Sequence, residues 1–136
     1  MKHFFKFAPV VLLCVFLSGC IRTGNPEPTT AYVTQIRVVG NYRGRMIQRD
    51  YTQNEKMETV LHYLRTLDPQ GYVHWDPKRL PGSVFRITLT LSNGKERHYL
   101  QRADRYLTRN GSSWKNIDRF QARDLYALLL LTPSDL

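Results

Sequence analysis

The stretch VFRITLTLSNGKERHYLQR, Val84 to Arg102, decides the fold of this chain. Apolar and polar residues alternate on both sides of Asn93-Gly94. Asn-Gly is the residue pair that best accepts the positive φ values of a two-residue type I′ turn. The pattern therefore predicts a β-hairpin in which Val84–Ser92 pairs with Lys95–Arg102.

A two-residue turn fixes which side chains share a face of this hairpin. With Ser92 opposite Lys95, His98 falls on the apolar face of the first strand. The apolar set of that strand is Phe85, Ile87, Leu89 and Leu91. The polar face receives Arg86, Thr88, Thr90, Arg97, Tyr99 and Gln101. We therefore expect a polar surface on one side of the hairpin and core on the other.

A strand and a helix are expected before the hairpin. Residues Ala31–Gly40 are rich in β-branched side chains and end in a turn-forming Gly-Asn pair, which predicts a strand. Thr52–Glu55 has the form of a capping box, and apolar residues follow it at helical spacing. This predicts a helix over Gln53–Leu67. The Pro- and Gly-containing stretch Asp68–Gly82 is expected to be a loop.

A second hairpin follows the first. Arg105–Arg109 and Ser112–Ile117 flank another Asn-Gly pair, Asn110-Gly111. A two-residue turn places Leu107 opposite Trp114, an arrangement typical of core packing. The sequence therefore predicts a second strand pair beside the first.

A last helix completes the expected fold. Asp118 is a good N-cap for a helix over Arg119–Leu131, with Gln121 in the third position for a reciprocal cap. The run Leu128–Leu131 is too apolar for a fully solvated helix, so it should pack on the sheet or on a partner. The expected fold class is α+β, with a small antiparallel sheet built from one strand and two hairpins and two helices on one face.

The N-terminus has the organisation of a signal peptide. Charged residues between Lys2 and Lys6 precede the uncharged run Phe7–Leu17, and small residues then lead to Cys20. A membrane-spanning helix needs about 20 apolar residues, and this run is shorter. An uncleaved anchor is the alternative.

Leu17-Ser18-Gly19-Cys20 resembles the lipobox of bacterial lipoproteins. The resemblance implies that residues 1–19 are removed and that Cys20 becomes the lipidated first residue of the mature chain. Two or more acyl chains anchor a protein persistently to a membrane. Residues 20–30 are then a flexible tether, and residues 31–136 a single small α+β domain. In related lipoproteins, an Asp directly after the lipidated Cys can retain the protein in the inner membrane. Here that position is Ile21, which implies sorting to the outer membrane if the source has one.

Charge is the most informative feature of the rest of the chain. The formal net charge is +9, or +7 once Lys2 and Lys6 are removed, and fourteen of the cations are arginines. Guanidinium groups hold phosphates or carboxylates in a bidentate fork. The candidate binding surface lies on the polar face of the first hairpin and consists of Arg86, Arg97, Tyr99 and Gln101. A candidate second patch consists of Arg102, Arg105 and Arg109.

Patterns for catalysis or metal binding are sparse. His62, His74 and His98 are widely separated, and no HExxH, GxSxG or phosphate-binding loop occurs. His74 and Asp76 flank Trp75, but zinc needs at least three protein ligands. We therefore expect no catalytic residue, no metal and no cofactor. A pocket joining this loop to another titratable group would instead favour an enzyme.

These observations predict a non-catalytic cell-envelope lipoprotein that binds or assembles with an anionic envelope component or a partner protein. The membrane is reached through the lipid on Cys20, and an exported domain would not meet nucleic acid. Two alternatives stay open: an envelope enzyme that uses the His74–Asp76 loop, and a purely structural lipoprotein subunit. The sequence does not choose an oligomeric state.

Overall fold

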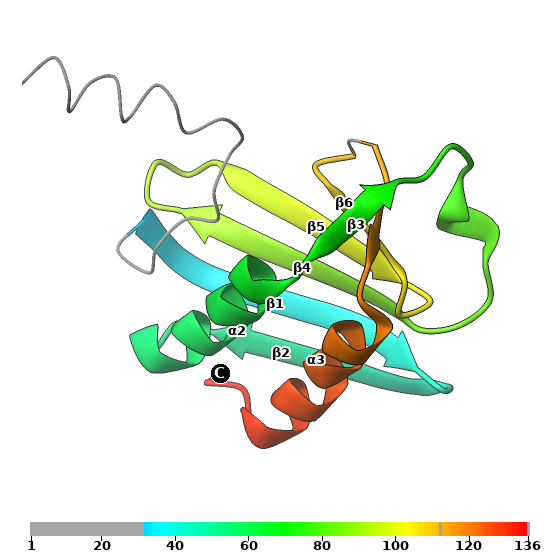
Figure 1. Cartoon of the computed structure of the whole chain (residues 1–136). Coiled ribbons are helices and arrows are strands. Elements are labelled where there is room, and N and C mark those ends of the chain that lie inside the picture. Colours follow the sequence, from blue (N-terminus) through cyan, green and yellow to red (C-terminus); the bar gives the residue numbers. More distant parts are fainter. Residues whose placement is uncertain (1–31, 112, 136) are drawn as a thin grey trace, which may run out of the picture.

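The computed structural model describes residues 32–111 and 113–135, which form one seven-stranded antiparallel sheet with two helices on one face (Figure 1). The strands are β1 (Val33–Tyr42), β2 (Arg45–Tyr51), β3 (Pro69–Tyr72), β4 (Val84–Leu91), β5 (Glu96–Arg102), β6 (Tyr106–Arg109) and β7 (Lys115–Ile117). The helices are α2 (Asn54–Thr66) and α3 (Arg119–Leu131), and a 3-10 turn, η2, spans Pro77–Arg79. The strand order is β2-β1-β4-β5-β6-β7-β3.

The predicted α+β class, with an antiparallel sheet and both helices on one face, is confirmed. The sheet has two strands more than the five expected, because β2 and β3 were not predicted. The lipobox, Leu17–Cys20, and the tether, residues 20–30, lie outside the described residues.

The strand β2 was not predicted because the sequence pattern placed the turn after β1 too early. β1 runs through Gly40 to Tyr42 and turns at Arg43-Gly44, whose φ values are 51° and 80°. The expected turn after Gly40 is wrong because Gly40 lies inside the strand, where the Phe85 ring covers it. β3 lies in the stretch expected to be a loop. Its proline and glycine are tolerated because β3 is at the edge of the sheet.

The hairpin β4–β5 has a three-residue loop instead of the expected two-residue turn. The Leu91 N–H donates to the Lys95 carbonyl at 2.8 Å, and the Gly94 N–H donates to the Leu91 carbonyl at 2.9 Å. Gly94 has a φ of 84°, whereas Asn93 is not among the residues with positive φ, so the pair does not form a type I′ turn. The expected register is therefore wrong by one residue.

This shift reverses the two faces of β5. Ile87 pairs with Tyr99 and Phe85 pairs with Gln101, so both β5 residues point into the core, each only 1% exposed. The Gln101 amide is satisfied there, because its Nε2 donates to the Ala122 carbonyl at 3.1 Å and its Oε1 accepts from the Tyr63 hydroxyl. Burial raises the pKa of Tyr63, which keeps this hydroxyl protonated as a donor.

The second hairpin also differs from the expected register. Leu107 pairs with Lys115 rather than with Trp114. Leu107 packs partly against the core, whereas Trp114 lines a pocket together with Thr108 and Leu100. The expected Leu107–Trp114 core pair is therefore wrong.

Both predicted helices are confirmed, and their contacts add detail to the predicted caps. The Asp118 carboxylate accepts the Phe120 N–H at 2.8 Å, as expected for an N-cap. Gln121 does not close a reciprocal cap. Its side chain instead accepts the Asp68 N–H at 3.0 Å and donates to the Thr66 carbonyl at 3.2 Å, which joins the start of α3 to the end of α2.

The start of α2 is capped from the far end of the chain. The N-cap residue is Gln53, which makes no side-chain capping bond, so the expected Thr52 capping box is wrong. The Asp135 carboxylate instead accepts the backbone N–H groups of Thr52 and Gln53, at 2.5 and 2.8 Å, and pairs with Lys56 Nζ at 2.9 Å. This carboxylate satisfies orphan donors at a helix start that favours negative charge.

The Asp135 contacts predict a pH-dependent contribution to stability. The bonds from Gln53, with those from Lys56 and Thr52, lower the pKa of Asp135 from 3.8 to about 2. Because the folded-state pKa is the lower one, the ionised carboxylate stabilises the fold above about pH 4, and this contribution is lost as the pH falls to about 2. Asp135→Asn should lower the urea concentration at the unfolding midpoint at neutral pH. The same variant should lose less stability than wild type as the pH falls. Urea unfolding between about pH 2 and pH 7 measures this, with the exposed Asp124→Asn as control; equal profiles for Asp135→Asn and wild type would refute it.

Candidate functional site

The face of the sheet without helices carries Arg86, one of the four residues predicted to form the binding surface. In β4 and β5, Arg86 pairs with Leu100, and Leu100 pairs with Thr108 of β6, which makes one row across this open face. Thr88 and His98 form the next row toward the β4–β5 loop. The open face therefore mixes cations, hydroxyls and apolar groups.

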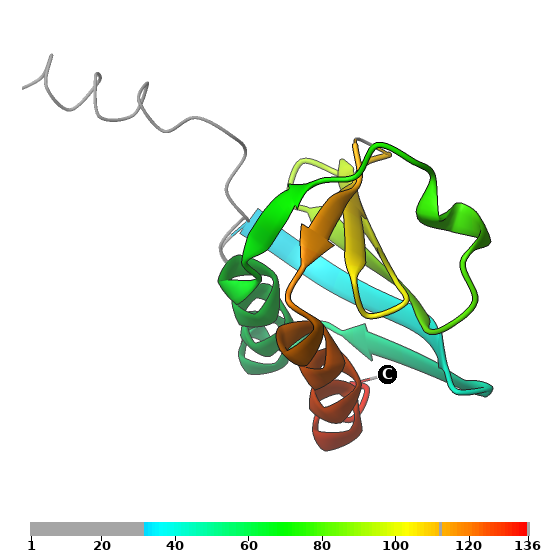
Figure 2. The same cartoon turned by 45° about the vertical axis from the view of Figure 1, so that its right-hand side comes forward.

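The segment 73–82 stands over the β6–β7 side of this face, away from the helices (Figure 2). Its start is fixed by the Val73 N–H, which donates to the Trp114 carbonyl at 3.0 Å. Its end is fixed by Arg102 Nη1, which donates to the Leu80 carbonyl at 2.8 Å. Between these points the rings of Trp75 and Tyr106 meet edge to face, with centroids 5.2 Å apart. The segment is thus held at both ends and in its middle.

A cavity of about 340 Å³ lies between this segment and the sheet, which is within the size range of small-molecule sites. We call it the loop pocket. Its principal lining residues are Asp76, Lys78, Arg86, His98, Leu100, Thr108 and Trp114. Leu100 and the indole of Trp114 supply apolar surface, and the remaining side chains supply polar groups. Because its wall is held in place, the pocket is largely pre-formed.

The charges of the loop pocket favour an anion. Lys78 and Arg86 are exposed basic residues, and within the described part of the chain neither side chain has an ion-pair partner. Among the described residues, Asp76 is the one carboxylate that lines the pocket, and it accepts the Lys78 backbone N–H at 3.0 Å and so caps η2. His98 lies 3.3 Å from the Thr88 hydroxyl and 3.4 Å from Glu96, and it adds positive charge when protonated.

The expected binding surface of Arg86, Arg97, Tyr99 and Gln101 does not exist as one surface. Arg86 lies in the loop pocket, whereas Tyr99 and Gln101 are in the core and Arg97 pairs with Leu89 on the helix-covered side. The physical reason is the one-residue shift of β5, which exchanges its faces.

The second candidate patch is divided as well. Arg102 is used to hold the segment 73–82, and Arg109 pairs with Tyr99. Arg105 lies in a different cavity, described below. The sequence pattern missed Lys78, His98 and Trp114 as site residues. A three-residue loop at Asn93-Gly94, in place of the expected two-residue turn, would have placed His98 on the correct face.

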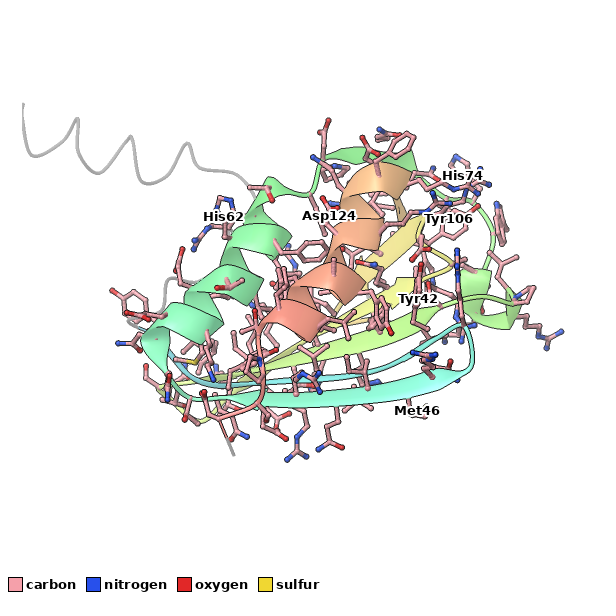
Figure 3. All side chains as sticks on the ribbon, turned by 90° about the horizontal axis from the view of Figure 1, so that it is seen from below. Tyr42, Met46, His62, His74, Tyr106 and Asp124 are labelled. Carbon is pink, nitrogen blue, oxygen red and sulfur yellow. The ribbon has the colours of Figure 1, made fainter. Side chains whose placement is uncertain are left out.

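The candidate enzyme loop contributes only one of its two titratable residues to the pocket. Asp76 lines the loop pocket, but His74 is exposed and is not among the lining residues. The pocket does join Asp76 to His98, a second titratable group. His62 lies away from His74 (Figure 3). It lines a separate cavity between α2 and α3 with Glu55, Glu58 and Asp124.

Among residues 32–111 and 113–135, no three His, Cys, Asp or Glu side chains gather closely enough to hold a metal ion. Neither α2 nor α3 is long and apolar enough to cross a membrane, and the described residues contain no other α-helix. Comparisons with protein-family models, curated proteins and solved structures find no match for this chain.

Proposed function

We propose that this protein is a non-catalytic lipoprotein of the bacterial cell envelope whose domain binds an anionic envelope component in the loop pocket. The observation that carries the proposal is the gathering of Lys78, Arg86 and His98 around the apolar surface of Leu100 and Trp114. Guanidinium and ammonium groups at a partly enclosed site attract phosphates and carboxylates more strongly than isolated surface cations do.

The location outside the cytoplasm rests on the resemblance of Leu17–Cys20 to a lipobox. A lipid on Cys20 would keep the domain within reach of the polymers of the envelope. The high positive charge of the chain supports the same class of ligand, since it raises the local concentration of anionic polymers.

Charge reversal in the loop pocket tests this function. Lys78→Glu combined with Arg86→Glu should weaken binding to immobilised polygalacturonate and polyglycerol phosphate by about tenfold, because two attractions become repulsions. Retention of the full chain in a salt gradient measures the change. Arg123→Glu is the control, because it reverses one exposed charge on α3 and leaves the loop pocket unchanged. Failure of the wild-type chain to bind either polymer, or equal retention of the pocket variant, would overturn the proposal.

An envelope enzyme is the second candidate, and one observation favours it: Asp76 and His98 line the same pocket. A carboxylate and an imidazole are common partners in acid–base catalysis. Incubation of the full chain with each retained polymer separates the two candidates. Shortened polymer chains would support the enzyme, and unchanged lengths would support the binding protein.

A further inference from the structure

A second basic cavity, of about 320 Å³, lies beside the loop pocket. We call it the edge pocket. Its lining consists of Gln70, Arg105, Tyr106, Asn116, Ile117 and Arg119. Two guanidinium groups and two side-chain amides can therefore donate hydrogen bonds into it, and no carboxylate lines it among the residues that the structure describes. The edge pocket is thus suited to an anionic group.

The acidic residues next to the edge pocket already have partners. Asp104 accepts the Ser83 hydroxyl at 2.7 Å, and Asp118 accepts the Phe120 N–H at the start of α3. Within the described residues, the guanidinium groups of Arg105 and Arg119 have neither a hydrogen-bond nor an ion-pair partner, and both residues are exposed. They are available to a ligand from solution.

The two pockets lie along the same strands of the open face. Tyr106 lines the edge pocket, and Thr108, two residues further along β6, lines the loop pocket. Asn116 and Trp114 are related in the same way at β7. Two residues of a strand span about 7 Å, so one extended ligand can reach both pockets.

An exposed aromatic side chain, Trp75, has neighbours in both pockets: Asp76, the next residue in the chain, lines the loop pocket, and Tyr106 lines the edge pocket. Trp75 packs its ring edge to face with Tyr106 and is still 51% exposed. The C–H groups of a sugar ring pack well on the face of an indole, whereas a lone anion makes no such contact. The combination of flanking cations with an exposed indole therefore favours a sugar polymer that carries acidic groups.

We propose that the loop pocket and the edge pocket form one continuous track for an extended anionic polysaccharide, with Trp75 under a sugar ring between two acidic groups. This inference rests on the proposed function, because it assigns the ligand class of the loop pocket. It adds that Arg105, Arg119 and Trp75 belong to the same site. A ligand that spans both pockets gains affinity from the second contact without a second loss of translational freedom.

The length of the ligand tests the track. Oligogalacturonates of two and ten sugars are titrated into the full chain. Fluorescence reports binding because the sequence has two tryptophans: Trp114 lines the loop pocket and Trp75 packs on Tyr106 of the edge pocket. The ten-sugar chain should bind at least about tenfold more tightly. Arg105→Glu with Arg119→Glu should remove this advantage, so that the ten-sugar chain binds that variant no more tightly than the two-sugar chain does. Trp75→Ala should weaken binding of the ten-sugar ligand more than it weakens binding of polyglutamate of equal charge.

The outcomes separate this inference from the proposed function. Equal affinity for both lengths, with binding still lost in the Lys78 and Arg86 variant, would leave the loop pocket as a binding site and overturn the track. Tighter binding of a ten-nucleotide single-stranded DNA than of the ten-sugar ligand would overturn the assignment to polysaccharide. Absence of binding to every anionic probe would overturn both.

Discussion

Tyr99→Ala should destabilise this protein by about 3–5 kcal/mol, the usual cost of removing a large aromatic side chain from a packed core. Tyr99 is 1% exposed and lies opposite Ile87, on the helix-covered face of β5. A loss of this size is a large fraction of the roughly 5–15 kcal/mol that stabilises a typical domain. Urea unfolding followed by circular dichroism measures it.

The neighbouring residue is the matched control for this prediction. His98 is exposed on the opposite face of the same strand, so His98→Ala should change the free energy of unfolding by only about 0.5 kcal/mol. The two-residue turn expected from Asn93-Gly94 would place His98 in the core and Tyr99 outside. A larger loss for His98→Ala than for Tyr99→Ala would therefore restore that register and contradict the one described.

Gly40→Ala should destabilise the protein by about 1–3 kcal/mol, although alanine is the smallest possible addition. A Cβ on Gly40 would meet the Phe85 ring, with Cε1 at 2.7 Å, and the Val84 carbonyl oxygen at 2.9 Å. Both positions are closer than carbon and oxygen atoms normally approach, and Phe85 is only 1% exposed. The added methyl group has no free space, so the ring or the strand must move.

A double-mutant cycle tests whether Phe85 is the cause. Phe85→Leu makes the side chain facing Gly40 smaller, so Gly40→Ala should cost less in that background, with a coupling energy of about 0.5–3 kcal/mol. Thermal or urea unfolding of the four proteins gives the cycle. Additive losses would show that the Phe85 ring does not limit the space at Gly40.

The Gly40 contact also explains why β2 was missed. From the sequence, Gly40-Asn41 looks like the end of a strand, because glycine and asparagine favour turns. In the sheet, Gly40 has another role: its missing side chain makes room for Phe85 of the neighbouring strand. A local pattern cannot distinguish these two uses of glycine, since the second depends on a residue 45 positions away in the chain.

The candidate site shows the same limit. Arg86 was identified from the alternation of β4, because one strand is enough to decide which of its own residues are polar. Its partners in the loop pocket were not identified, because Lys78 and Trp114 reach the pocket from other elements of the fold. His98 was assigned to the wrong face because the length of one loop decides the orientation of the whole of β5.

The sequence alone determined the α+β class, the ranges of both helices and the two hairpins, since these follow from local periodicity, capping residues and Asn-Gly pairs. It also carries the lipobox resemblance at Cys20, which is a property of a short segment. Only the tertiary structure decided the register of β5, the capping of α2 by Asp135 and the gathering of Lys78, Arg86 and His98. The reason is physical: a strand changes faces with a shift of one residue, and pockets and distant caps exist only when packing brings remote segments together.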